Sequence, residues 1–182
     1  LFDSPVNIPA VQAAIIKKAN ELGVMPEFAK PKPNGRKVAL VGAGPAGFGA
    51  AAVLAQKGYK VDIYDAARSA GGMCNLIPDS RLDKKVLKTD LDFIAALGAV
   101  SLRYGRKVPD PAKPGNDYDA VLVTTGLDDP IRLKLPGEEA AVLWPDFLKK
   151  PAKYRLKGRR VVVIGGGAVA VDCAETAQAG GA

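Results

Sequence analysis

A glycine-rich turn occurs twice in this chain, each time between a short apolar run and a run of small residues. The first copy is RKVALVGAGPAGFGAA, which begins at Arg36, and the second is RRVVVIGGGAVAVDCA, which begins at Arg159. A shift of 123 positions aligns the two copies, with glycine on glycine at two places in the turn. Each copy has the pattern of a buried strand, a tight turn and a closely packed helix. The sequence therefore predicts the same strand–turn–helix unit twice.

Between the two turns, apolar runs of strand length alternate with segments of helix length. The predicted strands are 38–41, 61–64, 100–103, 120–124 and 161–164. The predicted helices are 45–57 and 84–97, and an amphipathic helix precedes them over 11–22. Strands that alternate with helices are typical of a parallel sheet with helices on its faces. We therefore expect an α/β fold built from doubly wound parallel sheets.

The segment PKPNGRK, 31–37, has the composition of a linker. The predicted division is an N-terminal helical segment with this linker over 1–35, an incomplete Rossmann-like domain over 36–136, and the truncated start of a second such domain over 137–182. The first residue is Leu, and the second unit stops soon after its helix begins. We therefore expect the sequence to be a fragment of a longer chain.

The first turn has the residues that a dinucleotide-binding turn requires. Gly42 permits the tight turn, Gly44 lets the backbone approach a pyrophosphate, and Gly47 lets helix and strand pack closely. The pyrophosphate would lie on the free N–H groups of the helix that begins near Pro45. Asp65 ends the next strand, 23 positions after Gly42, and would accept hydrogen bonds from a ribose hydroxyl. A glycine turn without a ligand is the alternative interpretation.

The second turn keeps two of the three glycines. Gly165 and Gly167 repeat the first two roles, and Ala170 replaces the third glycine, which this kind of turn allows. The strand that would distinguish NAD from NADP lies beyond Ala182. The sequence therefore predicts a second dinucleotide site but leaves NAD and NADP open.

Composition excludes several other kinds of site. The chain has no histidine, which removes the usual imidazole base and metal ligand. Cys74 and Cys173 lie far apart and outside any C-x-x-C pattern, so a disulfide framework or cysteine-bound metal is not predicted, and both thiols are expected to be buried and inert. No segment approaches the roughly 18 apolar residues needed to cross a bilayer, and we expect no leader. We expect a cytoplasmic protein without a membrane span.

The net charge of +7 is concentrated in one segment. Seven basic residues and no acidic residue lie between Lys149 and Arg160. A solvated face is the simpler interpretation, and a positive field near a phosphate-bearing ligand or an acidic partner is the other. No aromatic residues interleave with the charges in a stacking pattern, so nucleic-acid binding is not predicted.

The order of these motifs resembles that of a known family. The motifs are VGAGPAG, Asp65, Gly71–Gly72, IPDSRL, VTTG and IGGGAVAVDCA, and the likeness runs from about Val6 to Ala182. The chain is most similar to the small (beta) subunit of glutamate synthase and to the matching domains of dihydropyrimidine dehydrogenase and related reductases. In that family the first turn holds FAD and the second holds NADPH or NADH.

The resemblance implies a role for each matching residue. For FAD these are Gly42, Ala43, Gly44, Pro45, Ala46, Gly47, Asp65, Gly72, Met73, Arg81, Val108, Thr125 and Gly126; for the nicotinamide cofactor they are Gly165, Gly167, Ala168, Val169 and Ala170. Arg81 would pair with FAD phosphate, to which arginine presents a planar fork. Asp65 and Ala168 replace the Glu and Asn that are usual in the family, and Asp83 replaces a Pro after the arginine.

The resemblance also implies an activity. Hydride would pass from NAD(P)H to FAD, and electrons would pass on to an acceptor subunit or domain in a larger complex. Iron–sulfur clusters would lie, if present, in parts of the protein outside this sequence. No side chain here needs to act as a general acid or base, because the cofactors carry the chemistry. Two alternatives stay open: a non-catalytic FAD-binding assembly or sensor module, and an NAD-dependent dehydrogenase without flavin.

Overall fold

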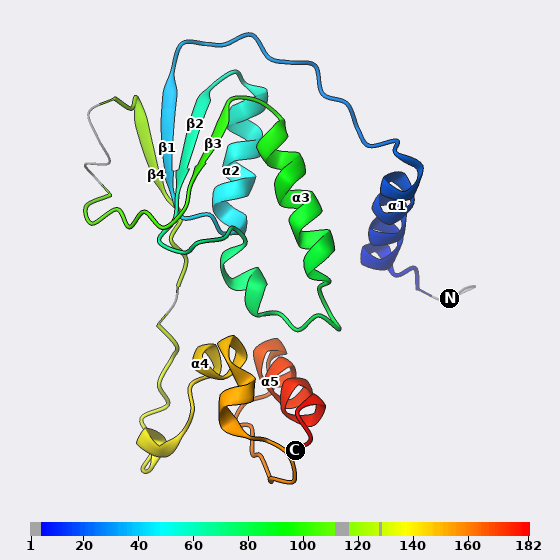
Figure 1. The fold of residues 1–182 in the computed structure, drawn as a ribbon, viewed down its shortest axis with the longest axis vertical. Coiled ribbons are helices and arrows are strands. Elements are labelled where there is room, and N and C mark those ends of the chain that lie inside the picture. Colours follow the sequence, from blue (N-terminus) through cyan, green and yellow to red (C-terminus); the bar gives the residue numbers. More distant parts are fainter. Residues whose placement is uncertain (1–4, 112–116, 128) are drawn as a thin grey trace. The chain divides into compact units, whose positions relative to one another are not determined.

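The computed structural model describes residues 5–111, 117–127 and 129–182, and the chain divides into two compact units, 1–30 and 31–182. The first unit holds helix α1 (Ile8–Leu22) (Figure 1). The side chain of Asn7 accepts a hydrogen bond from the Ala10 amide (3.1 Å), so the helix begins three residues before the predicted start. Gly23 ends it in the left-handed conformation, with φ of 67°.

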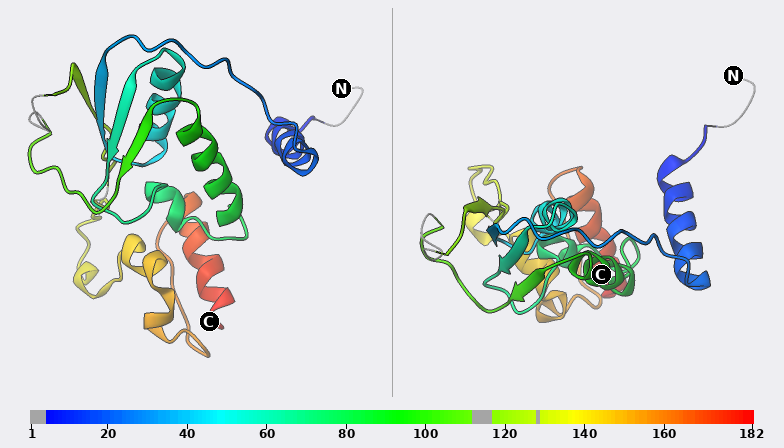
Figure 2. Two further views of the ribbon diagram at one scale, coloured as in Figure 1. Left: turned by 45° about the horizontal axis from the view of Figure 1, so that its top comes forward. Right: turned by 90° about the horizontal axis from the view of Figure 1, so that it is seen from above.

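The second unit is built around a parallel sheet of four strands (Figures 1 and 2). The strands are β1 (Lys37–Val41), β2 (Lys60–Tyr64), β3 (Val100–Arg103) and β4 (Ala120–Val123), in the order β3-β2-β1-β4. Helix α2 (Pro45–Gln56) connects β1 to β2, and helix α3 (Lys84–Ala96) precedes β3. The predicted α/β class and parallel sheet are confirmed.

Helices α2 and α3 cover one face of this sheet (Figure 2). Alternate residues of the two central strands, Val38 and Leu40 with Val61 and Ile63, form a buried cluster with Phe48 of α2. Leu91 and Ile94 of α3 pack against the same cluster. The period-two alternation of β1 and β2 therefore turns one apolar side of each strand to the helices, which fixes the position of the turn between β1 and α2.

The opposite face of β2 carries a buried charge. Asp62 is 1% exposed; its Oδ2 accepts a hydrogen bond from the Tyr118 hydroxyl (2.7 Å) and lies 3.2 Å from Lys37 Nζ. Burial acts to raise the pKa of Asp62, but the Tyr118 hydrogen bond and the Lys37 and Arg103 charges outweigh it and lower that pKa. Burial, followed by hydrogen bonds with Tyr64 and Asp62, raises the pKa of Tyr118. The neutral hydroxyl and the ionised carboxylate therefore tie the segment before β4 to β2.

The C-terminal part of the second unit is helical. It contains η2 (Glu138–Ala140), α4 (Trp144–Lys149), η3 (Pro151–Tyr154) and α5 (Ala168–Ala179). Phe147, Leu156, Cys173 and Ala177 form its buried cluster, with Trp144 against it. The seven basic residues between Lys149 and Arg160 are all exposed, as a solvated face requires. The further division into 36–136 and 137–182 stays a prediction.

The prediction of a strand at 161–164 is wrong. The segment forms no ladder within the described residues, and Val162 and Ile164 are 86% and 68% exposed. A strand exists only when a neighbour takes up its backbone N–H and C=O groups, and the described part of the chain places no other strand beside this one. Among the described helices, none is both long and apolar enough to span a bilayer.

Candidate functional site

The first glycine turn lies where three neighbouring strands end. Val41, the last residue of β1, is level with Tyr64 at the end of β2 and Val123 at the end of β4. The connection from β1 goes through α2 to β2 on one side, whereas β4 pairs with β1 on the other. This reversal of strand order is the place where open α/β sheets bind ligands, at the carboxyl ends of the strands.

Two glycines in the turn fill spaces that have no room for a side chain. Gly42 has φ of 119°, and a Cβ there would lie 2.3 Å from the carbonyl oxygen of Thr124. A Cβ on Gly47 would lie 2.0 Å from the carbonyl oxygen of Gly42. The turn, the first turn of α2 and the end of β4 are therefore packed backbone against backbone, as the sequence predicted for helix and strand.

Thr124 is a turn residue that the sequence analysis missed. Its hydroxyl lies 2.9 Å from the carbonyl oxygen of Gly42 and 3.2 Å from that of Val41, and it donates to this pair. The VTTG motif is the signal in the sequence, but the family resemblance points to Thr125 and Gly126 within it. Those two residues follow Thr124 and are exposed, with Gly126 in the left-handed region at φ of 76°.

A second backbone segment crosses the turn. The Gly71 amide donates to the carbonyl oxygen of Ala43 (2.8 Å), and Gly72 begins the short helix η1 (Gly72–Leu76). A Cβ on Gly72 would lie 2.9 Å from the Cα of Gly44. Gly44 caps the N-terminus of α2, where the first N–H groups have no partner within the helix. Two bare backbones and a helix N-terminus therefore meet, which is an arrangement that suits a phosphate group.

Asp65 fixes the turn from the end of β2. Its Oδ2 accepts a hydrogen bond from the Ala43 amide (2.7 Å), and its Oδ1 accepts one from the Ala67 amide (2.7 Å). An ionised carboxylate has about four lone-pair positions, so both oxygens can still accept from another donor. The structure thus brings Asp65 to the turn, and its bond to a ribose hydroxyl stays a prediction.

The other residues expected at the first site lie at varied distances from the turn along the chain. Met73 is half-buried in η1, directly after Gly72, and Val108 is half-buried in the segment after β3. Arg81 lies in the loop between η1 and α3, where its Nη1 forms an ion pair with Asp172 of α5. Its pairing with FAD phosphate therefore stays a prediction, and the structure adds a partner that the sequence analysis did not foresee.

The second turn repeats the backbone of the first. Gly165 has φ of 127°, close to the 119° of Gly42. Gly167 caps α5 with φ and ψ of −81° and 175°, and Gly44 caps α2 with −80° and −177°. The Cβ of Ala170 lies 3.6 Å from the position that a Cβ on Gly165 would take, which is an ordinary contact. The second turn is therefore more open than the first, and this explains why it accepts alanine in place of the third glycine.

Neither cysteine lies in a group of potential metal ligands among the residues that the structure describes. Within the described residues no group of three or more His, Cys, Asp or Glu side chains is placed for metal binding. Cys173 is buried as expected, and burial together with the Asp172 charge raises the pKa of its thiol. Cys74 is half-buried, so the prediction of a buried thiol is wrong. The reason is that η1 is a short helix without buried residues.

Several known proteins are similar to this chain over most of its length. The chain is 41% identical, over 82% of its own length, to the beta subunit of the NADP(+)-dependent formate dehydrogenase of Moorella thermoacetica, and covers 22% of that protein. It is 32% identical to the small chain of the Escherichia coli (strain K12) glutamate synthase [NADPH], over 97% of this chain and 41% of the relative. The chain therefore spans less than half of the length of each of these relatives.

A solved structure and a protein family are also similar to this chain. Mycobacterium tuberculosis FprA, solved in complex with NADPH, matches 79% of this chain and 36% of its own with a TM-score of 0.66 at 25% identity. Residues 36–182, which include both glycine turns, match the family described as "Pyridine nucleotide-disulphide oxidoreductase". This match covers most of the sequence, and the chain belongs to the pyridine nucleotide-disulphide oxidoreductase family.

Proposed function

We propose that this chain is the dinucleotide-binding part of an FAD-dependent NAD(P)H oxidoreductase. One observation carries the proposal: two turns in one chain have the same backbone conformation, and each caps a helix with a glycine. Two such turns provide two separate places for a pyrophosphate. One dinucleotide would deliver hydride and the other would receive it.

The first site would hold FAD. Its turn, Gly42 to Gly47, would take the pyrophosphate, and Asp65 would accept from the ribose. The bare contact between Gly44 and Gly72 fits this use, because a Cβ at either position would cover the backbone that the phosphates approach. Met73, Thr125 and Gly126 would lie near the flavin, Val108 near adenine, and Arg81 near the phosphates.

The second site would hold the nicotinamide cofactor. Gly165 and Gly167 would shape the turn, and the first turn of α5, from Ala168 to Ala170, would present its N–H groups to the pyrophosphate. The formate dehydrogenase subunit and the glutamate synthase small chain are named for NADP(H), and FprA was solved with NADPH, which favours NADP(H) over NAD(H) here. Another relative, a glutamate synthase of Schizosaccharomyces pombe, is named for NADH, so both cofactors belong in the test.

FAD, when bound, would supply the redox chemistry, since a flavin can exchange electrons singly or in pairs. The residues of this chain bind and orient the two dinucleotides and need no general acid or base. The names of the relatives support a place in a larger assembly, since two of them are subunits. We propose an electron-accepting partner centre, iron–sulfur clusters outside this sequence, and a cytoplasmic location.

The test uses the protein purified at its full natural length. We expect it to be yellow from bound FAD, and anaerobic addition of NADPH or NADH to bleach the flavin absorbance within seconds. A yellow protein that neither nucleotide bleaches would favour a non-catalytic FAD-binding module. A colourless protein that binds only nicotinamide cofactor would favour a dehydrogenase without flavin. Either result would contradict the proposed function.

A further inference from the structure

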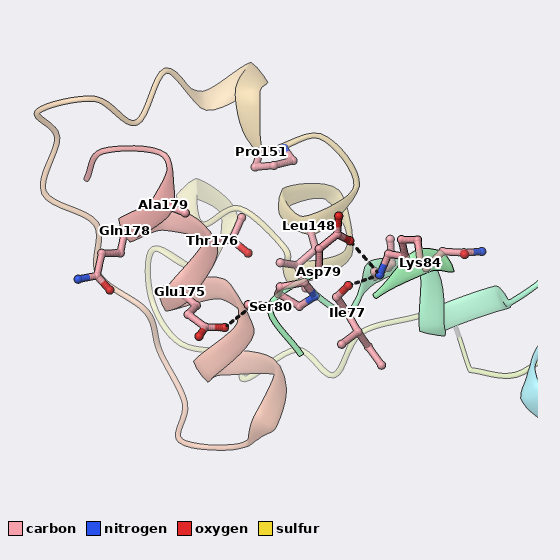
Figure 3. A pocket seen from close by; sticks show the side chains of 13 residues that line it. Ile77, Asp79, Ser80, Lys84, Leu148, Pro151, Glu175, Thr176, Gln178 and Ala179 are labelled. Atoms are coloured by element: carbon pink, nitrogen blue, oxygen red, sulfur yellow. Dashed lines mark hydrogen bonds and ion pairs between the residues drawn. The ribbon is translucent and has the colours of Figure 1, made fainter. Parts of the chain in front are cut away.

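Two side-chain pairs join the loop after η1 to helix α5. Arg81 forms an ion pair with Asp172, and the Ser80 hydroxyl donates to Glu175 Oε2 (3.1 Å), a bond drawn in Figure 3. Asp172 and Glu175 are three residues apart on α5, so both lie on the side of the helix that faces the loop. These four residues are called here the loop–α5 contact.

The ion pair in this contact contains a buried charge. The Asp172 side chain is 6% exposed, and the Arg81 side chain is 42% exposed. A buried carboxylate that loses its partner strongly destabilises a protein, whereas an exposed pair contributes little. The ion pair with Asp172 therefore fixes the point on α5 that Arg81 contacts.

Apolar packing does not fill the space beside the loop–α5 contact. An open cavity of about 650 Å³ lies there, between the loop on one side and α4 and α5 on the other (Figure 3). Leu76, Leu148 and Pro151 line it together with Lys84 and Glu175. Since the two sides are not joined by a continuous core at this place, directional polar pairs have a larger share in setting their distance.

The loop that carries Ser80 and Arg81 is itself held firmly. The carbonyl oxygen of Pro78 accepts hydrogen bonds from the amides of Arg81 (2.9 Å) and Leu82 (3.0 Å). Lys84 Nζ donates to the carbonyl oxygens of Ile77 and Cys74, and lies 3.6 Å from Asp79 Oδ1. The loop therefore has a fixed conformation, against which α5 can be positioned.

This loop, together with η1, connects the two glycine turns. At its start, η1 places Gly72 against Gly44 in the first turn. At its other end it contacts Asp172, which lies five positions after Gly167, the residue that caps α5 in the second turn. Contacts between backbone and side chains thus run from one turn to the other.

We propose that the loop–α5 contact sets the position of the second glycine turn relative to the first, with Arg81 and Asp172 as positioning residues. This inference rests on the proposed function, in which the two turns hold the two dinucleotides whose reacting rings must meet. It gives Arg81 a role that differs from the pairing with FAD phosphate implied by the family resemblance. The two roles predict different behaviour for variants of Asp172, which faces Arg81.

The experiment is a double-mutant cycle in the protein at its full natural length. Arg81→Gln, Asp172→Asn and the double variant are compared for FAD content and for the rate of flavin reduction by NADPH. We expect each single variant to slow reduction by about tenfold to a hundredfold, because small misplacements of reacting groups have effects of that size. The double variant should be no slower than the slower single variant, and Asp172→Asn should keep its full FAD content.

Hydrogen exchange provides a readout that needs no nucleotide and no activity. Amides of 168–179 should exchange faster in both single variants than in the wild type, because α5 loses the contact that positions it. Lys88→Gln is the matched control, since Lys88 pairs with Asp92 within α3 and does not join the two turns. Its flavin reduction and its exchange in α5 should equal those of the wild type.

Three results would overturn the inference. The first is loss of FAD in Arg81→Gln with normal reduction and exchange in Asp172→Asn, which would make Arg81 a phosphate ligand. The second is additive effects of the two substitutions, and the third is wild-type exchange in α5 in both variants. Failure of the proposed function is distinct, because it would show as a wild-type protein whose flavin is absent or not bleached, while the exchange experiment would still test the contact.

Discussion

At the scale of single residues, the first turn depends on positions that have no room for a methyl group. A Cβ on Gly47 would lie 2.0 Å from the carbonyl oxygen of Gly42, whereas Gly49, two residues later in the same helix, has nothing within 4 Å of its Cβ position. The same substitution at the two sites therefore separates close packing from helix propensity.

We expect Gly47→Ala to lower the free energy of unfolding by about 1–3 kcal/mol, because overpacking forces the turn to shift. Gly49→Ala should raise it by about 0.5–1 kcal/mol, since alanine favours the helix more than glycine does. Urea denaturation of both variants measures the difference. Similar changes in the two would contradict the close packing of turn, helix and strand.

The buried Asp62 gives stability a specific dependence on pH. Its pKa in the folded protein lies below the ordinary value of 3.8, because Tyr118, Lys37 and Arg103 outweigh burial. Such a group contributes stability that is complete above the unfolded pKa and is lost as the pH falls through the folded pKa. We expect the free energy of unfolding to fall as the pH decreases from 3.8, and Asp62→Asn to reduce that slope. Denaturation midpoints at pH values above and below 3.8 measure this pH dependence. Equal slopes in both proteins would contradict a lowered pKa of Asp62.

Local motifs were predictable at this scale, and distant partners were not. The three glycines of the first turn and Asp65 follow from spacing within one strand–turn–helix unit and the next strand. The hydrogen bond of Tyr118 to Asp62 joins residues 56 apart, and the pair Arg81–Asp172 joins residues 91 apart. No pattern in the sequence fixes such pairs, because they depend on how the elements pack.

At the scale of elements, a predicted strand formed only where a neighbouring strand pairs with it. The four paired strands match apolar runs that the sequence predicts, and α2 and α3 match their predicted ranges to within one residue at each end. The run 161–164 is equally apolar, yet it lies outside the sheet and is largely exposed. Apolar pattern predicts the tendency to form a strand, but only a neighbouring strand satisfies the backbone.

The junction of β4 with the first turn is open to a direct test. Thr124→Val keeps the shape of the side chain but removes the hydroxyl that donates to the carbonyl oxygens of Val41, the last residue of β1, and Gly42. We expect a loss of about 1 kcal/mol in the free energy of unfolding, the usual contribution of one hydrogen bond.

Thr125→Val is the matched control, because Thr125 is exposed. It should leave the free energy of unfolding unchanged within about 0.5 kcal/mol, as surface substitutions do. Thermal or urea unfolding of the two variants makes the comparison. An equal loss in both would show that the hydroxyl of Thr124 has no special part in the junction.

At the scale of the whole molecule, the sheet, both glycine turns and the loop between them belong to one compact unit, 31–182. The first turn is complete, with an acid from the next strand and a second backbone segment across it. The second turn repeats this backbone and is followed by α5, and within the described residues no strand is paired beside it. We therefore assign a different dinucleotide to each turn.

The most direct test of this assignment is the binding stoichiometry of the protein at its full natural length. Equilibrium dialysis against FAD and NADP⁺ together, with NAD⁺ in a parallel experiment, measures how much of each dinucleotide one polypeptide retains. We predict that each polypeptide retains equimolar FAD and nicotinamide cofactor, with neither displacing the other. Retention of neither compound, or displacement of one by the other from a single shared site, would contradict it.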